Sequence, residues 1–396
     1  MLKKLSRNVI ALGGVSFFTD VSTEMIYPLL PLFLSSVLGA SASFIGVIEG
    51  AAESVAALLK LASGWWSDRV KKRKPLVVFG YGLATFVRPF TAIAQNATQV
   101  LLIRLSDRVG KGIRSSPRDA LLADSITDPS MRGRSFGFHA AADNAGAVLG
   151  PLTAFALLKG MHLSLRGVFW LAAIPGILAF IVLVVAVKEV ERTPESHSDG
   201  KAGIPSEAGG LGGRFWVYLI VVLVFTLGNS TDAFLLLRAN QLGVAVALAP
   251  ILWALLNFIK AALGTWGGGL SDRLGRKPLI IAGWIIYAAV YFGFARATVA
   301  WHAWALFAAY GLFYAFTEGT EKAFVADLVP RLRRGSAYGW YNLAIGLGAL
   351  PASLIFGAIW DRSSPQAAFL FGASLALIAA IGMTVVRAPA ALPNAD

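Results

Sequence analysis

The chain contains no cysteine and little charge. Of its 396 residues, only 4 are histidine and only 14% are Asp, Glu, Lys or Arg. The lack of cysteine excludes disulfide bonds and thiolate metal sites. Soluble domains carry about 25% charged residues, so the charge here is too sparse to cover a water-facing surface. A Gly-x-x-x-x-Gly-Lys-Ser/Thr loop and a metal-spaced histidine cluster are also missing, so the sequence predicts neither an enzyme nor a nucleotide or metal cofactor.

What the chain has in abundance is apolar sequence. Hydrophobic residues make up 56% of it, and the mean hydropathy is +0.66. A helix that spans a bilayer needs about 20 apolar residues, so twelve spans would use about 240. Apolar segments recur at positions 10–36, 44–67, 75–95, 98–125, 133–158, 166–188, 214–237, 245–271, 277–296, 300–328, 335–360 and 366–388. We therefore expect an all-α polytopic membrane protein with twelve transmembrane helices. The first segment has no small-residue cleavage pattern and is interpreted as a span, not a signal peptide.

The positive charge follows the expected topology. The net charge is +13, which in a soluble protein would suggest nucleic-acid binding. If the N-terminus is cytoplasmic and the segments alternate sides, most Lys and Arg residues outside the spans fall in cytoplasmic loops and tails. This bias is the positive-inside rule. We therefore expect a multi-pass protein of the cell (inner or plasma) membrane with both termini cytoplasmic, the lipid bilayer as its surroundings and no nucleic-acid partner.

The chain divides near its midpoint into two similar halves. The segment 189–213 is rich in Gly, Ser, Glu and Pro and indicates a flexible cytoplasmic linker. It separates an N-terminal six-helix half, 1–188, from a C-terminal six-helix half, 214–396. Ala120-Leu-Leu-Ala-Asp124 in the first half is matched by Ala323-Phe-Val-Ala-Asp327 in the second. An internal repeat of six spans is typical of secondary transporters, which bind their solute between the halves.

A second repeated motif carries a resemblance to a known family. Its residues are Gly64, Asp68 and Arg69 in the first half and Gly268, Asp272, Arg273, Gly275 and Arg276 in the second. The second copy resembles the cytoplasmic loop motif of the major facilitator superfamily. The first copy departs from it, because Lys71 stands where the family prefers glycine. The resemblance implies twelve helices in two halves with pseudo-two-fold symmetry, and a gate that latches the halves. The alternative is that these basic residues only fix the topology.

The fourth apolar segment carries an unusual polar face. Its ionisable residues are Arg104, Asp107, Arg108, Lys111, Arg114, Arg118 and Asp119. At 100° per residue they fall within an arc of roughly 140°. Such a face has to point into water or into the bundle, so we expect it to line the solute cavity. Its excess of positive charge favours an anionic solute. Alternatively, Arg118 extends to the membrane surface and Asp107 belongs to a structural ion-pair network.

Acidic residues inside the first, second and fifth segments are candidates for carrying protons. Asp20 and Glu24 lie one turn apart, as do Glu49 and Glu53, and Asp143 follows in the fifth segment. Ionisable residues inside a membrane are costly and mark functional pathways. Two nearby carboxyl groups can share a proton, because like charges resist joint ionisation. Asp20, Glu24 and Glu53 are the leading candidates; alternatively, arginines of the fourth segment neutralise these acids.

The fifth segment also contains a small-residue motif, Gly146-x-x-x-Gly150-Pro151. Small residues four apart let helices approach closely, and proline bends a helix. The motif resembles the fifth-span signature of antiporters in the superfamily, although Ala154 and Phe155 replace its trailing glycines. The resemblance implies export in exchange for protons. The alternative is ordinary helix packing.

The second half is more aromatic than charged. Tyr310, Tyr314, Trp340 and Tyr341 are predicted to form an apolar wall for the solute, and Asn144 and Glu318 are further candidates for binding it. Glu318 could instead form a simple ion pair with Lys322. The sequence as a whole predicts a monomeric secondary transporter that uses the proton gradient to export a small amphipathic or anionic compound. Alternatives are a proton symporter or facilitator for an organic anion or sugar-like metabolite, and a membrane solute sensor that does not transport.

Overall fold

The computed structural model describes residues 5–69, 72–126, 132–190, 211–329 and 334–386. Every regular element in these ranges is a helix, and ten helical segments are long and apolar enough to cross a membrane. Two further helices are as long: α5 (Ala97–Asp124), which carries ionisable residues from Arg104 to Asp124, and α13 (Ala300–Leu328), whose acidic residues and lysine lie between Glu318 and Asp327. The described residues therefore contain the twelve crossings that the sequence predicts.

Several crossings are built from two shorter helices. In the first half the other elements are α1 (Arg7–Ile26), α2 (Leu30–Ser36), α3 (Ala42–Arg69), α4 (Lys74–Val87), the 3-10 helix η2 (Arg88–Ile93), α6 (Arg132–Gly160), α7 (Leu165–Leu171) and α8 (Ala173–Ala186). In the second half they are α9 (Gly213–Gly228), α10 (Ala233–Gln241), the 3-10 helix η4 (Val246–Leu248), α11 (Ala249–Leu274), α12 (Arg276–Arg296), α14 (Arg334–Arg362) and α15 (Pro365–Val385). Pro28 separates α1 from α2, because proline has no backbone N–H to continue the helix.

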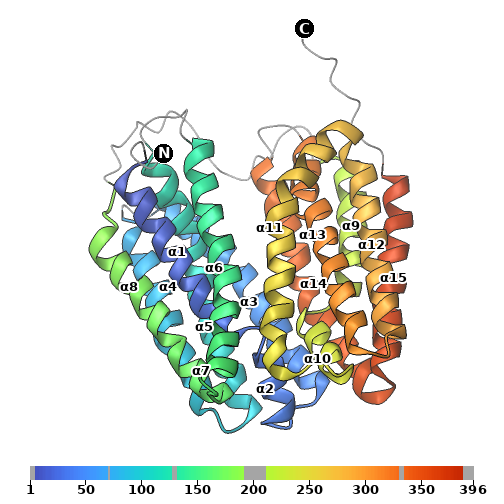
Figure 1. The fold of residues 1–396 in the computed structure, drawn as a ribbon. Coiled ribbons are helices and arrows are strands. Elements are labelled where there is room, and N and C mark those ends of the chain that lie inside the picture. Colours follow the sequence, from blue (N-terminus) through green and yellow to red (C-terminus); the bar gives the residue numbers. More distant parts are fainter. Residues whose placement is uncertain (1–4, 70–71, 127–131, 191–210, 330–333, 387–396) are drawn as a thin grey trace.

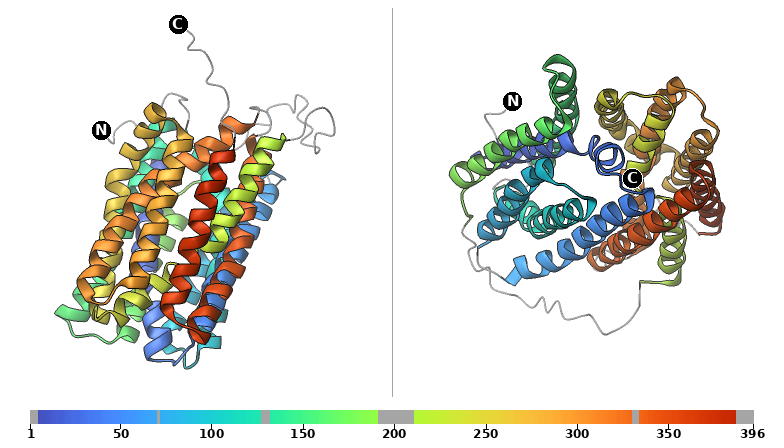
Figure 2. Two further views of the ribbon diagram at one scale, coloured as in Figure 1. Left: turned by 90° about the vertical axis from the view of Figure 1, so that its right-hand side faces the viewer. Right: turned by 90° about the horizontal axis from the view of Figure 1, so that it is seen from below.

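The two groups of helices form separate bundles. In Figure 1, α1 and α4 to α8 lie on the left, α9 to α15 lie on the right, and α2 and α3 lie in the middle; the start of α1 and the end of α15 are at the upper end. The bundles are apart at that end and meet at the opposite end, where α2 contacts α10. Figure 2 shows the same arrangement from the side and from below. The cross-bundle contacts are mainly α3 with α14 and α6 with α11.

Glycines bring α3 and α14 unusually close. A Cβ atom at Gly46 would lie 2.3 Å from the carbonyl oxygen of Ser353, and one at Gly346 would lie 2.2 Å from Cβ of Ala57. The Ser54 hydroxyl donates a hydrogen bond of 2.6 Å to the carbonyl of Gly346. Because no larger residue fits at these positions, the glycines allow backbone contact between the two halves.

A carboxylate from the second half also caps a helix of the first. Asp361, at the end of α14, accepts hydrogen bonds from the backbone N–H groups of Ala42 at 3.1 Å and Ser43 at 2.7 Å. These N–H groups belong to the first turn of α3 and have no partner within the helix. A negative charge at a helix N-terminus is also electrostatically favourable. The halves are therefore joined by polar contacts at the end where α2 contacts α10.

Gly46→Ala is expected to open this end of the molecule. The added methyl group collides with the backbone of Ser353, and such overpacking costs about 1–3 kcal/mol, which shifts a two-state population about 5- to 150-fold. Because the chain has no cysteine, spin labels on Ser41→Cys and Ser363→Cys would report the separation without background. The label distance should lengthen in Gly46→Ala. It should stay unchanged in Gly137→Ala, where the added methyl meets no other atom. An unchanged distance in both variants would show that this contact does not hold the end closed.

Candidate functional site

The polar face of α5 points mainly into the first half. Arg104 donates hydrogen bonds of 3.0 and 2.6 Å to the two carboxylate oxygens of Glu49 on α3. Asp107 lies 3.7 Å from Arg104 and accepts a bond of 2.8 Å from Arg88 at the start of η2. The Arg88 guanidinium also donates to Ser22 of α1 at 2.8 Å. These side chains are buried and neutralise one another, so they brace the bundle.

The prediction that this whole face lines the cavity is therefore corrected. Arg108 is buried 3.5 Å from Glu53, and the guanidinium of Arg114 is buried over the Tyr81 ring, with 3.9 Å between the guanidinium carbon and the ring centroid. Of the seven ionisable residues predicted to form this face of α5, Lys111 lines a cavity of about 540 Å³ between α3, α5 and α14, whereas Arg104 and Asp107 line a small cavity of about 20 Å³ inside the first half. The spacing of these residues shows that they share one face of the helix. Whether that face contacts a cavity or other side chains depends on how the neighbouring helices pack against it. Arg88, which was not among the predicted site residues, also belongs to the network.

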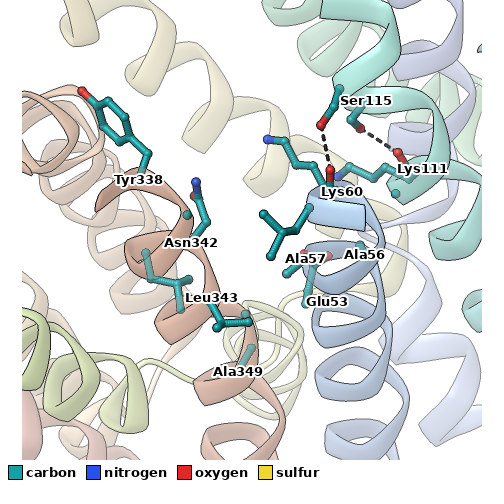
Figure 3. A pocket seen from close by; sticks show the side chains of 16 residues that line it. Glu53, Ala56, Ala57, Lys60, Lys111, Ser115, Tyr338, Asn342, Leu343 and Ala349 are labelled. Atoms are coloured by element: carbon teal, nitrogen blue, oxygen red, sulfur yellow. Dashed lines mark hydrogen bonds between the residues drawn. The ribbon is translucent and has the colours of Figure 1, made fainter. Parts of the chain in front are cut away.

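Described residues of both halves line two cavities between them. Cavity 1 has a volume of about 540 Å³ and is formed by α3, α5 and α14 (Figure 3). Cavity 2 has a volume of about 440 Å³ and is formed by α6, α11 and α13. The polar residues of cavity 1 are Glu53, Lys60, Lys111, Ser115, Ser116, Tyr338 and Asn342. Those of cavity 2 are Asp143, Asn144, Asn257, Lys260, Tyr314 and Glu318. Both volumes suit a small organic molecule.

The glycine motif of α6 packs against the acid pair of α1. A Cβ atom at Gly146 would lie 2.9 Å from Cβ of Asp20, and one at Gly150 would lie 2.9 Å from Cβ of Glu24. The same two Cβ atoms would also lie 2.6 and 2.7 Å from backbone carbonyl oxygens of α1. The motif, with Pro151 next in α6, is thus a close helix contact that sets the position of both carboxyl groups.

The predicted proton carriers differ in their partners. Glu49 is held by Arg104, and Glu53 lies near Arg108. Asp143 is 3.4 Å from His139 on the same helix. Glu24 instead accepts a hydrogen bond of 2.6 Å from the indole N–H of Trp253, which belongs to α11 in the other half.

Asp20 has no hydrogen-bond or ion-pair partner among the described residues. Asp20 and Glu24 of α1 therefore both lack a direct cationic partner within the described part of the chain. Glu24 joins the two halves through Trp253, whose ring also packs on Tyr27 of the first half, with 4.9 Å between ring centroids.

The predicted aromatic wall is not a single surface. Tyr310 and Tyr314 donate hydrogen bonds of 2.7 and 3.0 Å to the carboxylate of Asp232, and Tyr314 also lines cavity 2. Tyr341 is buried and donates a bond of 2.6 Å to Glu321. Trp340 is 46% exposed and packs on Trp216. The prediction is corrected because adjacent residues of one helix, such as these last two, point about 100° apart.

Glu318 pairs with a different lysine from the one considered in the sequence. Its carboxylate lies 3.9 Å from the ammonium of Lys260 on α11, and that ammonium sits 3.9 Å from the centroid of the Tyr314 ring. Lys322, one turn further along α13, has no ion-pair partner among the described residues. The pair thus joins two helices of the second half at the wall of cavity 2.

Only some residues of the repeated loop motif lie within the part of the chain that the structure describes. The side chains of Asp68, Arg69 and Asp272, together with Gly268, lie outside the described residues. Gly64 contacts Ser116, Arg273 is exposed, and Gly275 has a φ of +89°, a conformation that favours glycine.

Arg276 follows at the start of α12. It forms an ion pair with Asp327 at the end of α13, and Arg73 pairs in the same way with Asp124 of α5. These two ion pairs occupy equivalent places in the two halves, 203 residues apart. Asp124 and Asp327 were recognised in the sequence as repeats, but their partners were not.

Twelve crossings in two related halves, with cavities between them, define a polytopic membrane transporter. The family model of the Major Facilitator Superfamily matches residues 12–320 and 218–395. The chain belongs to this family, and it is therefore a multi-pass membrane transporter of a small-molecule substrate.

Sequence and structural similarity to known proteins supports this assignment. An uncharacterized MFS-type transporter of Methanocaldococcus jannaschii is 34% identical over 385 residues, which cover 96% of this chain and 94% of that protein. The quinolone resistance protein NorA of Staphylococcus aureus is 24% identical over 192 residues, 48% of each chain. The crystal structure of the nucleoside transporter NupG shares the fold, with a TM-score of 0.80, 14% identity, and coverage of 96% of this chain and 99% of that one.

Proposed function

We propose that this transporter uses the proton gradient to export a small amphipathic or anionic compound. The observation that carries the proposal is the acid pair of α1, Asp20 and Glu24, which is packed against the glycine motif of α6. Neither acid has a cationic partner in direct contact among the described residues. A carboxyl group in such surroundings can take up and release a proton without breaking an ion pair, which a coupling residue must do.

The contact of Glu24 with Trp253 supplies a link between protonation and conformation. A hydrogen bond to an ionised carboxylate is stronger than one to a neutral carboxyl group. Protonation of Glu24 would therefore weaken the bond that joins α1 to α11, and would favour separation of the halves there. Deprotonation would restore it. Asp143, which faces cavity 2 beside His139, and Glu53 remain further candidates for proton transfer.

Export is favoured over uptake by two observations. The motif Gly146-x-x-x-Gly150-Pro151, which resembles the fifth-span signature of antiporters, packs against the proposed proton carriers. The similarity to a quinolone resistance protein supports a solute of drug-like size. Uptake of an organic anion or a sugar-like metabolite with protons is the second candidate. In this proposal the solute binds in the cavities, where Asn144, Tyr314 and Glu318 line cavity 2.

The remaining features of the proposal concern topology and gating. We propose a cytoplasmic linker at 189–213 between halves 1–188 and 214–396, a monomer in the cell membrane, and both termini in the cytoplasm. The loop motif would latch the halves at the cytoplasmic side. The Arg276–Asp327 pair would hold one side of that latch rigid.

The direction and the coupling can be measured in inverted membrane vesicles. An imposed pH gradient, acid inside, should drive accumulation of the exported compound, and addition of that compound should release protons that a pH-sensitive dye detects. Vesicles without the protein and vesicles treated with a protonophore are the controls. If no compound in a panel of drugs, sugars and organic anions moves protons, and transport persists without a gradient, proton exchange is wrong.

A further inference from the structure

The two cavities occupy equivalent places in the two halves but differ in charge. The pseudo-two-fold axis relates α3, α5 and α14 around cavity 1 to α11, α13 and α6 around cavity 2. In α5 and α13, Lys111 corresponds to Tyr314 and Ser115 to Glu318, each pair 203 residues apart like the two equivalent ion pairs described above. Because equivalent helices form both cavities, the cavities differ in charge only through the side chains that line them.

In cavity 2, the positive charge of the lysine is balanced by carboxylates that line the same cavity. Its lysine, Lys260, faces the carboxylate of Glu318 at 3.9 Å, and Asp143 lies on the opposite wall. Cavity 1 has two lysines, Lys60 and Lys111, and one acid, Glu53. The acid already lies 3.5 Å from Arg108. Neither lysine of cavity 1 has an ion-pair partner among the described residues.

The two lysines approach cavity 1 from different helices. Figure 3 shows Lys60 on α3 and Lys111 on α5 beside each other at one wall, with Asn342 on α14 facing them. The hydroxyls of Ser115 and Ser116 donate to the backbone carbonyls of Lys111 and Lys60, at 2.6 and 2.8 Å. The two ammonium groups thus present positive charge to the same space, and Asn342 offers an amide donor across it.

The remainder of cavity 1 is apolar. Ala57 and Leu61 of α3 and Leu343, Ile345 and Ala349 of α14 form most of it. A pocket with a few polar groups at one wall and an apolar remainder favours an amphipathic ligand, with the polar groups setting its orientation. An ammonium group donates but cannot accept hydrogen bonds, so the matching head is an anion.

We infer that cavity 1 binds an amphipathic organic anion, whose carboxylate, sulfonate or phosphate group lies between Lys60 and Lys111 and whose apolar body lies against Leu61 and Leu343. The inference rests on the proposed function, because it names the class of compound that the transporter carries. It does not depend on the direction of transport or on proton coupling. Lys60 and Asn342 thereby join Lys111 as residues that determine specificity.

The test is equilibrium binding to the purified full-length protein by calorimetry. Three ligands of one shape would be compared: naphthalene carboxylate, its neutral carboxamide, and naphthylmethylammonium. The carboxylate should bind most tightly. The double variant Lys60→Gln, Lys111→Gln should weaken its binding about 10- to 100-fold and leave carboxamide binding unchanged. The double variant with arginine at both positions should retain carboxylate binding and also show that the cavity is intact.

Lys322→Gln is the matched control, because this lysine is exposed and lines neither cavity. It should leave carboxylate affinity unchanged. Equal affinity for carboxylate and carboxamide, or equal losses in Lys322→Gln and the double glutamine variant, would overturn the inference. The measurement is repeated in nanodiscs of phosphatidylcholine and of phosphatidylglycerol. If carboxylate binding disappears only with the anionic lipid, the anion that occupies the lysines is a lipid headgroup and the assignment to a solute is wrong.

Failure of this inference is distinguishable from failure of the proposed function. Binding at equilibrium needs no proton gradient, so loss of selectivity for anions would remove the site and leave proton-driven export of another compound possible. Selective binding of the carboxylate without proton movement in vesicles would keep the site and remove the coupling.

Discussion

Asp20→Asn is expected to reduce proton-driven transport to the level of vesicles without the protein, while exchange of solute down its own gradient continues. Asparagine has nearly the shape of aspartate, so it fits the contact in which Gly146 meets Cβ of this residue. An amide cannot take up or release a proton at physiological pH. The variant therefore keeps the packing of α1 on α6 and loses only the titrating group.

Two measurements separate this outcome from misfolding. Solute counterflow, which needs no proton gradient, should proceed in Asp20→Asn at close to the parental rate. Asp119→Asn is the matched control, because its side chain is 46% exposed and pairs with the neighbouring Arg118 at 2.8 Å. The control should keep proton-driven transport. If Asp20→Asn also transports against a gradient as the parent does, the coupling proton is carried elsewhere, and Glu24, Glu53 and Asp143 are next to be substituted.

Glu49→Gln is expected to lower the free energy of unfolding by about 3–5 kcal/mol. The substitution leaves the guanidinium of Arg104 in the bundle without its bidentate partner, since Asp107 at 3.7 Å is already bound to Arg88. An uncompensated buried charge costs far more than a lost surface contact. Reversible unfolding in mixed micelles would measure the change.

The paired variant Glu49→Leu, Arg104→Met tests the cause. Replacing a buried ion pair by apolar residues of similar volume is often neutral, so the double variant should recover most of the lost stability. Glu318→Gln is the comparison for an exposed ion pair, because the Glu318 side chain is 57% exposed. This substitution should lower the free energy of unfolding by at most about 1 kcal/mol. A loss in Glu49→Gln no larger than in Glu318→Gln would mean that water reaches Arg104 and that the network does not brace the first half.

The sequence was sufficient to predict the crossings but not their internal breaks. Runs of about 20 apolar residues mark spans regardless of their neighbours, because the bilayer sets their length. The separation of α1 from α2 depends on Pro28, and this local signal lay inside a continuous apolar run. The two halves were visible because Asp124 and Asp327 recur in similar surroundings.

The site was harder to predict than the fold. Spacing showed that Arg104, Asp107 and Lys111 share one side of a helix, but the rotation of that helix in the bundle depends on packing against α3 and η2. The structure consequently divides this side between a buried network and cavity 1. Arg88 carried a usable signal, because an arginine inside an apolar segment demands a partner. The bridge from Glu24 to Trp253 joins residues 229 positions apart, and one sequence offers no sign of it.

The equivalent ion pairs Arg73–Asp124 and Arg276–Asp327 have a consequence for the ancestry of the chain. A feature present in both halves is most simply inherited from a single six-helix ancestor whose gene was doubled. The pseudo-two-fold axis makes the contact of α3 with α14 and that of α11 with α6 two copies of one contact, which is the geometry of a homodimer. Such a dimer would have had two identical cavities. Fusion into one chain freed them to diverge, so that one now holds two lysines and the other a matched pair of charges.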